Sequence, residues 1–446
     1  MSENELKARD LPLVSPPMRI DRVLRPFLRF VAIESASGVV LLVCTLIALI
    51  LGNSPWSETM EAFWHTHLQI GVGTWELNQS LLHWINDGLM TIFFFVIGLE
   101  IKREVVDGEL RDPRKAALPV MAAVGGMLMP AVVYLLVLGN SEDGRSGWAI
   151  PMATDIAFVV GFLALLGKRV PLGLKILLLA LAIADDIGAI LVIALFYSTG
   201  LSPVALLFAG LGFGAIGICN WLGIRRVSVY VAVGIGIWLA LLYSGVHPTV
   251  GGVLLGLLTP ARPLIRRSDL VDAVSRMIDR LDGIEDRTHG HQETTIVGAL
   301  TTTVQESVSP LERLETALHP WVAFLIMPLF ALANAGVRID PTAFRHPIAW
   351  SVAAGLIVGK PLGITLLSWL AVRFRWASLP AGINWGILAA ASCLGGIGFT
   401  MSLFIANLAL SDDLLTAAKL GILTGSAVSA IAGLALLWLV LPNRSS

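Results

Sequence analysis

Two adjacent carboxylates, Asp185 and Asp186, interrupt a run of apolar residues that extends from Ile176 to Phe196. A run of about 20 apolar residues is long enough to cross a bilayer as a helix. On insertion scales, each charge near the centre of such a helix costs about 2.5–3.5 kcal/mol. Because folding does not require this cost, we expect the pair to bind a small cation or a proton. The alternative is a structural pair that bases elsewhere in the chain neutralise.

Apolar runs of this length recur along the chain. Hydrophobic residues make up 56% of the sequence and charged residues 14%, whereas soluble domains carry about 25% charged residues. This composition predicts an all-α polytopic membrane protein. The formal net charge of −1 at pH 7 gives no electrostatic basis for a nucleic-acid partner.

We expect about twelve transmembrane helices. They are predicted near residues 33–52, 81–101, 116–138, 149–166, 173–197, 203–221, 227–243, 247–260, 320–336, 348–371, 384–409 and 415–441. The segment at 247–260 is short and rich in glycine, so it need not cross the whole bilayer.

The basic residues alternate between successive loops. Six Lys and Arg residues precede residue 33, none lies in the loop 53–80, and five lie in 102–115. The positive-inside rule then places both termini in the cytoplasm. One loop departs from this pattern, because 337–347 is predicted outside but carries Arg338 and Arg345.

The polar segments divide the chain into four parts. We expect a cytoplasmic N-terminal segment at 1–32, helices 1–8 at 33–260, a polar cytoplasmic insert at 261–318 and helices 9–12 at 319–442. In the first outside loop, apolar residues alternate on both sides of Gly73-Thr74. This pattern predicts either a short β-hairpin or an irregular loop.

Two of the predicted spans contain helix-breaking residues. Pro151 removes a backbone donor, and Thr154-Asp155 can bond to the backbone in place of a helical turn. Three glycines at 395–398 weaken the span 384–409, unless they serve close helix packing. Asp155 could offset the partial positive charge of a helix N-terminus, bind a cation, or do both. Lys360, in the span 348–371, requires a carboxylate partner, for which Asp155 and Asp185 are the candidates.

The two interrupted spans occupy corresponding places in the chain. One is the middle of the trio 116–197 and the other is the middle of the trio 348–441. Interrupted spans in corresponding places of two halves indicate a transporter site between inverted-topology repeats. We therefore expect a repeat with one broken helix in each half.

Several segments resemble the motifs of the bacterial NhaA sodium/proton antiporters. They are Ala153–Phe158, Ala184–Ala189, Gly359–Gly363 and Gly396–Ser402, together with Leu82–Asp87, Gly98–Glu104 and Ser244–His247. The resemblance implies a secondary antiporter that exports Na⁺ or Li⁺ in exchange for protons by alternating access. It further implies electrogenic, pH-regulated transport in the bacterial inner membrane, with roles in pH homeostasis and salt tolerance.

The resemblance also implies roles for individual residues. Asp186 is the expected cation and proton ligand, and Asp185 is the neighbour that pairs with Lys360. Together these two carboxylates would hold the transported Na⁺. The resemblance implies that the two broken helices cross beside them, with Thr154 and Asp155 as support at the crossing. Five further residues are implied in pH response or in the funnel that admits ions from the cytoplasm: Asp87, Glu100, Glu104, His247 and Glu315. Family resemblance also predicts a homodimer formed through an outside hairpin near 66–79, surrounded by membrane lipid.

Two other functions are compatible with buried aspartates. An intramembrane aspartyl protease would need two aspartates on different helices, one of them in a Gly-x-Gly-Asp setting, and the sequence contains no such motif. A passive cation channel would differ by a flux that never couples to a proton gradient. No nucleotide-binding motif is present, so we expect neither ATP nor another cofactor. The insert 261–318 is longer than in compact members of the family.

Overall fold

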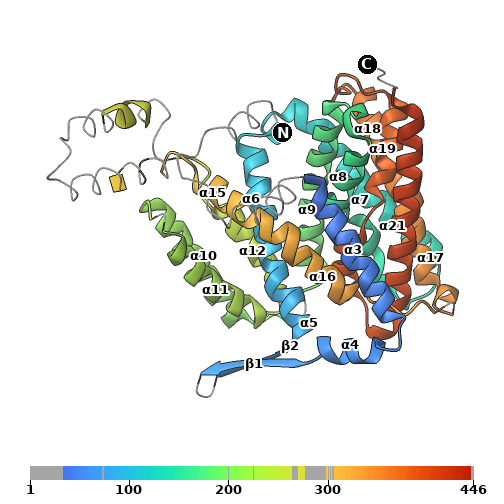
Figure 1. The fold of residues 1–446 in the computed structure, drawn as a ribbon, viewed down its shortest axis with the longest axis horizontal. Helices are drawn as coiled ribbons and strands as arrows, with labels where there is room; N and C mark the ends of the chain where they lie inside the picture. The colour runs from blue at the N-terminus through green and yellow to red at the C-terminus, as the bar shows by residue number, and fades with distance from the viewer. Residues whose placement is uncertain are drawn as a thin grey trace, which may run out of the picture.

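The computed structural model describes residues 34–72, 75–198, 200–224, 226–263, 270–276, 298–299, 301, 303, 306–340 and 342–442. Most of these residues form helices that pack into one bundle, beside which α10 and α11 form a separate pair (Figure 1). The predicted N-terminal segment 1–32 and much of the predicted insert 261–318 lie outside the described residues. Within that insert, residues 270–276 are helical.

The bounds of the longer helices follow the predicted spans. They are α3 (Glu34–Gly52), α6 (Met90–Val106), α7 (Pro113–Leu138), α8 (Ile156–Leu165), α9 (Leu172–Phe196), α10 (Pro203–Trp221), α11 (Val227–Leu242), α12 (Pro248–Leu258), α15 (Pro310–Trp321), α16 (Met327–Asn334), α17 (Pro347–Ala354), α18 (Lys360–Arg373), α19 (Trp385–Gly395), α20 (Phe399–Ala409) and α21 (Asp412–Val440). In the described part of the chain, seven helices are long and apolar enough to cross a membrane, some of them continuous across a 3₁₀ or π-helical turn. The number rises to nine if each of two bent helix pairs is counted as one span. Two shorter apolar helices, α11 and α12, accompany them.

Shorter elements connect or interrupt these helices. They are α4 (Ser57–Trp64), α5 (Leu81–His83), the 3₁₀ turns η2 (Glu109–Arg111), η3 (Arg145–Met152), η4 (Gly167–Arg169) and η6 (Ala343–Arg345), and the π-helical turns η1 (Trp84–Leu89), η5 (Val322–Ile326) and η7 (Gly355–Gly359). With α5, η1 and α6 taken as one span, each of the twelve predicted spans has a helical counterpart.

One predicted boundary is wrong. The ninth span was expected near residue 320, but α15 begins at Pro310. A capping box fixes this start, because the Ser309 side chain accepts from the Glu312 N–H while the Glu312 side chain accepts from the Ser309 N–H. The first turns of α15 are polar, so a search for apolar residues finds only its second half.

Two of the π-helical turns are followed by proline. The turn η5 precedes Met327-Pro328, and η7 precedes Lys360-Pro361. Proline has no N–H to donate to the preceding turn, and its ring displaces the carbonyl four residues earlier. A wider turn accommodates this loss while the helix continues. The second of these turns sets the position of Lys360.

A β-hairpin lies at one end of the bundle, which we call the hairpin end (Figure 1). Strand β1 (His67–Val72) pairs antiparallel with β2 (Trp75–Ser80), with Val72 opposite Trp75. The hairpin prediction is therefore confirmed, and the alternative of an irregular loop is wrong.

The loop that carries the two exceptional arginines lies at the same end of the bundle. Asn53 donates to the Val337 carbonyl at 2.9 Å and accepts from the Ile339 N–H at 2.7 Å. Arg338 donates to the Ser57 hydroxyl at 2.9 Å and lies 3.7 Å from a Glu58 oxygen. Both side chains of the Arg338–Glu58 pair are largely exposed, so this pair contributes little to stability.

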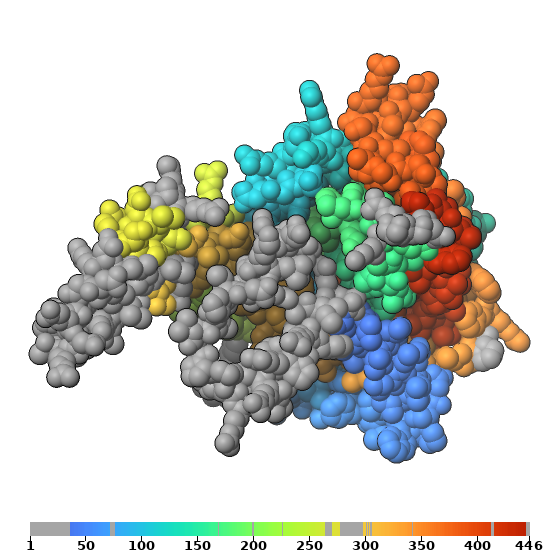
Figure 2. Space-filling view, turned by 45° about the horizontal axis from the view of Figure 1, so that its top comes forward, coloured from blue at the N-terminus to red at the C-terminus, as the bar shows by residue number. Residues whose placement is uncertain are grey.

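Two helical trios form the centre of the bundle. In the first, α7 leads to η3–α8 and then α9, and in the second, α17–α18 leads to α19–α20 and then α21. The first trio starts at the end of the bundle opposite the hairpin, and the second starts at the hairpin end (Figure 1). The two trios therefore run in opposite directions, as the predicted inverted repeat requires. Figure 2 shows one face of this bundle, where α3 (blue), the α8–α9 region (green) and α21 (red) form one continuous surface.

Candidate functional site

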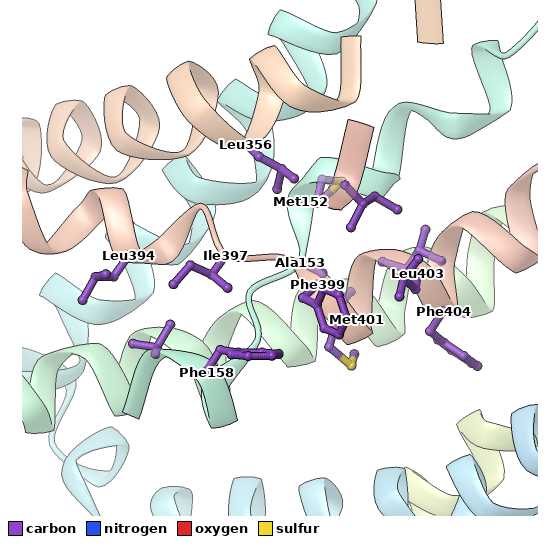
Figure 3. Packing of buried hydrophobic residues seen from close by; sticks show 14 of the residues in the cluster. Met152, Ala153, Phe158, Leu356, Leu394, Ile397, Phe399, Met401, Leu403 and Phe404 are labelled. Carbon is purple, nitrogen blue, oxygen red and sulfur yellow. The ribbon is translucent and has the colours of Figure 1, made fainter. Parts of the chain in front are cut away.

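The middle members of both trios are interrupted, as predicted. An extended segment at Ala153–Asp155 separates η3 from α8, and Gly396–Gly398 separates α19 from α20 with a bend of 47°. The two interruptions cross each other (Figure 3). The Asp155 N–H donates to the Ile397 carbonyl at 2.7 Å, which joins the two backbones at the crossing.

Apolar side chains fill the space around the crossing. The rings of Phe158 and Phe399 meet edge to face, with centroids 5.1 Å apart. Leu394 and Ile397 lie on one side of the crossing, and Leu403 and Phe404 on the other (Figure 3). The polar groups at the crossing are therefore enclosed in an apolar core, where unmet hydrogen bonds are expensive.

Asp155 caps two helices at once. Its Oδ1 accepts from the Phe158 N–H in the first turn of α8 at 3.3 Å. Its Oδ2 accepts from the Thr400 N–H in the first turn of α20 at 3.1 Å and also from the Thr400 hydroxyl. Each helix N-terminus carries partial positive charge, so one carboxylate offsets two of them. This geometry supports the interpretation of Asp155 as a compensator.

Asp185 engages the other side of the crossing. Its Oδ2 accepts from Lys360 Nζ at 2.5 Å and from the Thr154 hydroxyl at 2.7 Å. Lys360 also donates to Thr154 Oγ1 at 2.7 Å. The side chains of Lys360 and Asp185 are 0% and 1% exposed. Of the two candidate partners for Lys360, the structure selects Asp185.

Asp186 lies beside this ion pair and is 3% exposed. The buried oxygens Asp185 Oδ1 and Asp186 Oδ1 have no hydrogen-bond partner among the described residues. Electrostatic interactions reach Asp186 from the acids Asp185, Glu100 and Asp155 and from the base Lys360. Excess negative charge with unpartnered oxygens can accept a proton or a small cation.

The sequence is similar to those of known proteins along nearly its whole length. The chain matches the family described as Na⁺/H⁺ antiporter 1 over residues 28–437. A protein of Rhodopirellula baltica named Na(+)/H(+) antiporter NhaA is 51% identical over 440 residues, which cover 99% of both chains. The protein of that name from Rhizobium meliloti is 51% identical over 425 residues, covering 95% of this chain and 97% of its own.

The chain belongs to the Na⁺/H⁺ antiporter 1 family. A further relative, the Na(+)/H(+) antiporter NhaA 2 of Acidiphilium cryptum, is 48% identical over 424 residues, which are 95% of this chain and 94% of the relative. Membership in this family makes the protein a secondary transporter of the membrane rather than an enzyme.

The remaining residues that the family resemblance singled out fall into two groups. Glu315 forms an ion pair with Arg103, whose guanidinium also lies 4.0 Å from a Glu104 oxygen. Glu100, Arg103 and Glu104 lie on α6, whereas Glu315 lies on α15. Glu100 interacts electrostatically with the other three residues. The three acids surround Arg103 near the end of α6 that is far from the hairpin end.

Asp87 and His247 form the second group. Asp87 lies in η1, at the hairpin end of the span that continues as α6, and His247 directly precedes α12. Asp87 Oδ1 lies 3.4 Å from His247 Nε2, and Asp87 Oδ2 lies 2.8 Å from His83 Nε2. His247 Nδ1 is 2.7 Å from the Thr249 hydroxyl. In the described part of the chain, no hydrogen bond or ion pair joins either group to Asp185 or Asp186. Two weaker links remain, because the His247 ring packs edge to face against Phe404 of α20 and Glu100 interacts electrostatically with Asp186.

Sequence reasoning missed three residues of these sites. His83 is four residues before Asp87 on one helical face, a spacing that predicts contact and could have identified it. Arg103 lies in a motif but was read only as a basic loop residue. Thr400 lies in the motif Gly396–Ser402, but its role as a partner of Asp155 was missed because the two residues are 245 positions apart in the chain.

Proposed function

We propose that this protein exchanges Na⁺ for protons across the membrane and that Asp185 and Asp186 bind both ions in turn. The observation that carries the proposal is the pair of unpartnered carboxylate oxygens, Asp185 Oδ1 and Asp186 Oδ1, beside the crossing of two broken helices. The printed names of the relatives, which are Na⁺/H⁺ antiporters, give the same ions.

Competition for one set of oxygens couples the two fluxes. Na⁺ requires ionised carboxylates, whereas protonation removes the charge that holds Na⁺. A site that is open to one side of the membrane at a time therefore carries Na⁺ in one direction and protons in the other. Lys360 and Thr154 engage Asp185 Oδ2 and leave Oδ1 for the ion, so Na⁺ binding does not require that the ion pair break.

The same proposal covers the second cation, the membrane topology, the response to pH and the residues that support the site. Li⁺ replaces Na⁺ as a substrate, because it is also a small monovalent cation. Both termini and the insert 261–318 lie in the cytoplasm, and helices 1–8 within residues 33–260 and helices 9–12 within 319–442 cross the membrane. Asp87, Glu100, Glu104, His247 and Glu315 adjust the response to pH. Asp155 and Thr154 act as support for the site rather than as its principal ligands.

Na⁺-driven proton movement in proteoliposomes tests the proposed function. Protein is reconstituted with a pH-sensitive dye inside, and a pulse of Na⁺ is added over a series of pH values. We expect Na⁺ or Li⁺ added outside the vesicles to drive protons out. An inward proton gradient should drive the reverse exchange, in which protons enter and Na⁺ leaves. A cation flux that ignores the proton gradient would instead identify a passive channel.

We further propose that two copies of the chain associate through the hairpin. Leu68 and Ile70 on β1 are exposed, with 45% and 54% of their surface accessible. Each strand of a two-stranded sheet also has an open edge, and open edges tend to pair with another chain. In the family, the hairpin is the expected dimer contact.

Removal of the hairpin tests this association. Replacing residues 68–77 with a short glycine-serine linker is expected to give monomers in detergent while Na⁺-driven proton flux persists. Cross-linking before solubilisation measures the dimer fraction. If that fraction does not change, the dimer forms elsewhere.

A further inference from the structure

Three helices converge between the crossing and the hairpin end, and each supplies one asparagine and one phenylalanine. The α5–α6 span provides Asn86 and Phe94, α16 provides Phe330 and Asn334, and α20 provides Phe404 and Asn407. The three phenylalanines form one group and the three asparagines form another. No residue of either group belongs to the Asp185–Asp186 site.

The asparagines form a closed hydrogen-bonded cluster, which we call the amide latch. Asn334 Oδ1 accepts from Asn407 Nδ2 at 2.8 Å and from Asn86 Nδ2 at 3.3 Å. Asn334 Nδ2 donates to Asn86 Oδ1 at 2.9 Å and to the Phe330 carbonyl at 3.0 Å. A side-chain amide has two donors and two acceptor sites. All four are in use at Asn334, which is 1% exposed.

The phenylalanines lie deeper, on the side of the crossing. The ring of Phe404 is 5.2 Å from that of Phe94 and 6.3 Å from that of Phe330, measured between centroids. Along α20, Thr400 bonds to Asp155 at the crossing, Phe404 follows one turn later, and Asn407 lies about 10 Å beyond Thr400 at 1.5 Å per residue. The helix α16 ends at Asn334 beside the hairpin-end loop.

We infer that the amide latch holds α20 against η1 and α16 and thereby closes the hairpin end of the ion pathway in this conformation. The inference rests on the proposed function, because alternating access requires α20 and its neighbours to separate when the site opens to that side. When the site is open to the hairpin end, the Asn407–Asn334 hydrogen bond is broken.

The chemistry of the latch suits a gate that opens as a unit. Withdrawing Asn407 leaves a buried acceptor of Asn334 unmet, and a half-satisfied buried network is costly. Water that enters from the hairpin end removes this cost, so opening and hydration occur together. Amides do not titrate in the physiological range, so the hydrogen bonds of the latch themselves carry no ionisable group.

Thiol accessibility tests the latch directly. The reporter is Ala331→Cys on α16, one turn inside Asn334, in a chain whose Cys44, Cys219 and Cys393 are replaced by serine. In Asn407→Ala, we expect a membrane-impermeant maleimide applied from the hairpin side to label the reporter about fivefold faster, because one net hydrogen bond of the closed state is lost. The matched control is Asn220→Ala, which removes a half-buried asparagine bonded to Leu258 and Tyr230 and should leave labelling unchanged.

A reducible cross-link tests the same idea without weakening the closed state. Asn334→Cys with Asn407→Cys, bridged by a short bis-methanethiosulfonate, should lose most Na⁺-driven proton flux and regain it with dithiothreitol. The control pair Asn220→Cys and Tyr230→Cys should tolerate its bridge. The latch is overturned if labelling is unchanged in both Asn407→Ala and Asn334→Ala, or if the bridged 334–407 protein exchanges at the parent rate. Failure of the proposed function looks different, because the parent protein itself would then lack Na⁺-coupled flux.

Discussion

Asp185 and Asp186 are neighbours in the chain, yet their surroundings differ. They project about 100° apart on α9, so Asp185 reaches Lys360 and Thr154. Asp186 makes no equivalent ion pair among the described residues, and one of its oxygens is buried without a partner. The ion pair holds one oxygen of Asp185 and leaves the other for an ion, whereas Asp186 is not tied to a base in the described part of the chain. This difference predicts different consequences when each is neutralised.

The first prediction is that Asp186→Asn abolishes exchange. The neutral amide has nearly the same shape but neither holds Na⁺ by charge nor carries a proton. We expect no Na⁺-driven proton flux in proteoliposomes, with a normal elution volume in detergent showing that the fold persists. Asp185→Asn should retain partial flux. Full activity of Asp186→Asn would contradict its assignment as the ion ligand.

The second prediction concerns the buried ion pair. Asp185→Leu leaves Lys360 as an uncompensated buried charge, and breaking a buried pair from one side destabilises by about 3–5 kcal/mol. Replacing both partners with apolar residues of similar size is often neutral. We therefore expect a lower thermal midpoint for Asp185→Leu and recovery in the double variant Asp185→Leu/Lys360→Met. If the double variant is no more stable than the single one, the charge is not the cause.

At the scale of helices, the position of Lys360 depends on how closely α18 approaches α7. A Cβ atom placed on Gly363 would lie 2.0 Å from the Gly125 carbonyl oxygen, and one on Gly125 would lie 2.1 Å from that of Gly363. Both separations are far below van der Waals contact, and both obstacles are backbone. The two helices therefore touch through their glycines, one turn from Lys360.

The third prediction uses this contact. Gly363→Ala should force α18 away from α7, lower the thermal midpoint and reduce Na⁺-driven flux, because Lys360 moves with its helix. The matched control is Gly210→Ala on α10, where an added Cβ meets nothing within 4 Å. There alanine should be neutral or slightly stabilising, since it favours helix by about 1 kcal/mol. Equal effects of the two substitutions would argue against the close contact.

The sequence predicts those elements whose signals are local. Pro151 with Thr154-Asp155, and the glycines at 395–398, mark the two broken helices, and the alternation around Gly73-Thr74 marks the hairpin. The start of α15 was missed because its first turns are polar. The Thr400–Asp155 cap and the amide latch were missed for another reason. Helical periodicity indicates which face of a helix is buried but not which distant helix that face meets.

At the scale of the whole molecule, two explanations of pH dependence are separated in space. The Asp185–Asp186 pair lies beside the helix crossing. Asp87 forms a different group with His83 and His247, and the His247 ring packs against Phe404 of α20. Competition between Na⁺ and protons at the carboxylates needs only the first site. A regulatory step would need the second site, or the acidic group around Arg103, to change the conformation of the first.

The fourth prediction distinguishes these explanations by the Na⁺ dependence of exchange. Protons remove the charge that binds Na⁺, so apparent Na⁺ affinity should fall as pH falls. Where the site is mostly protonated, the half-saturating Na⁺ concentration rises about tenfold for each unit by which the pH falls, per displaced proton. Under competition alone, saturating Na⁺ restores binding at acid pH, and His247→Ala changes the profile little. We favour this outcome because Asp185 and Asp186 suffice for it. If saturating Na⁺ leaves the protein inactive at acid pH while His247→Ala shifts the profile, a conformational step controlled from the Asp87–His247 group must be added.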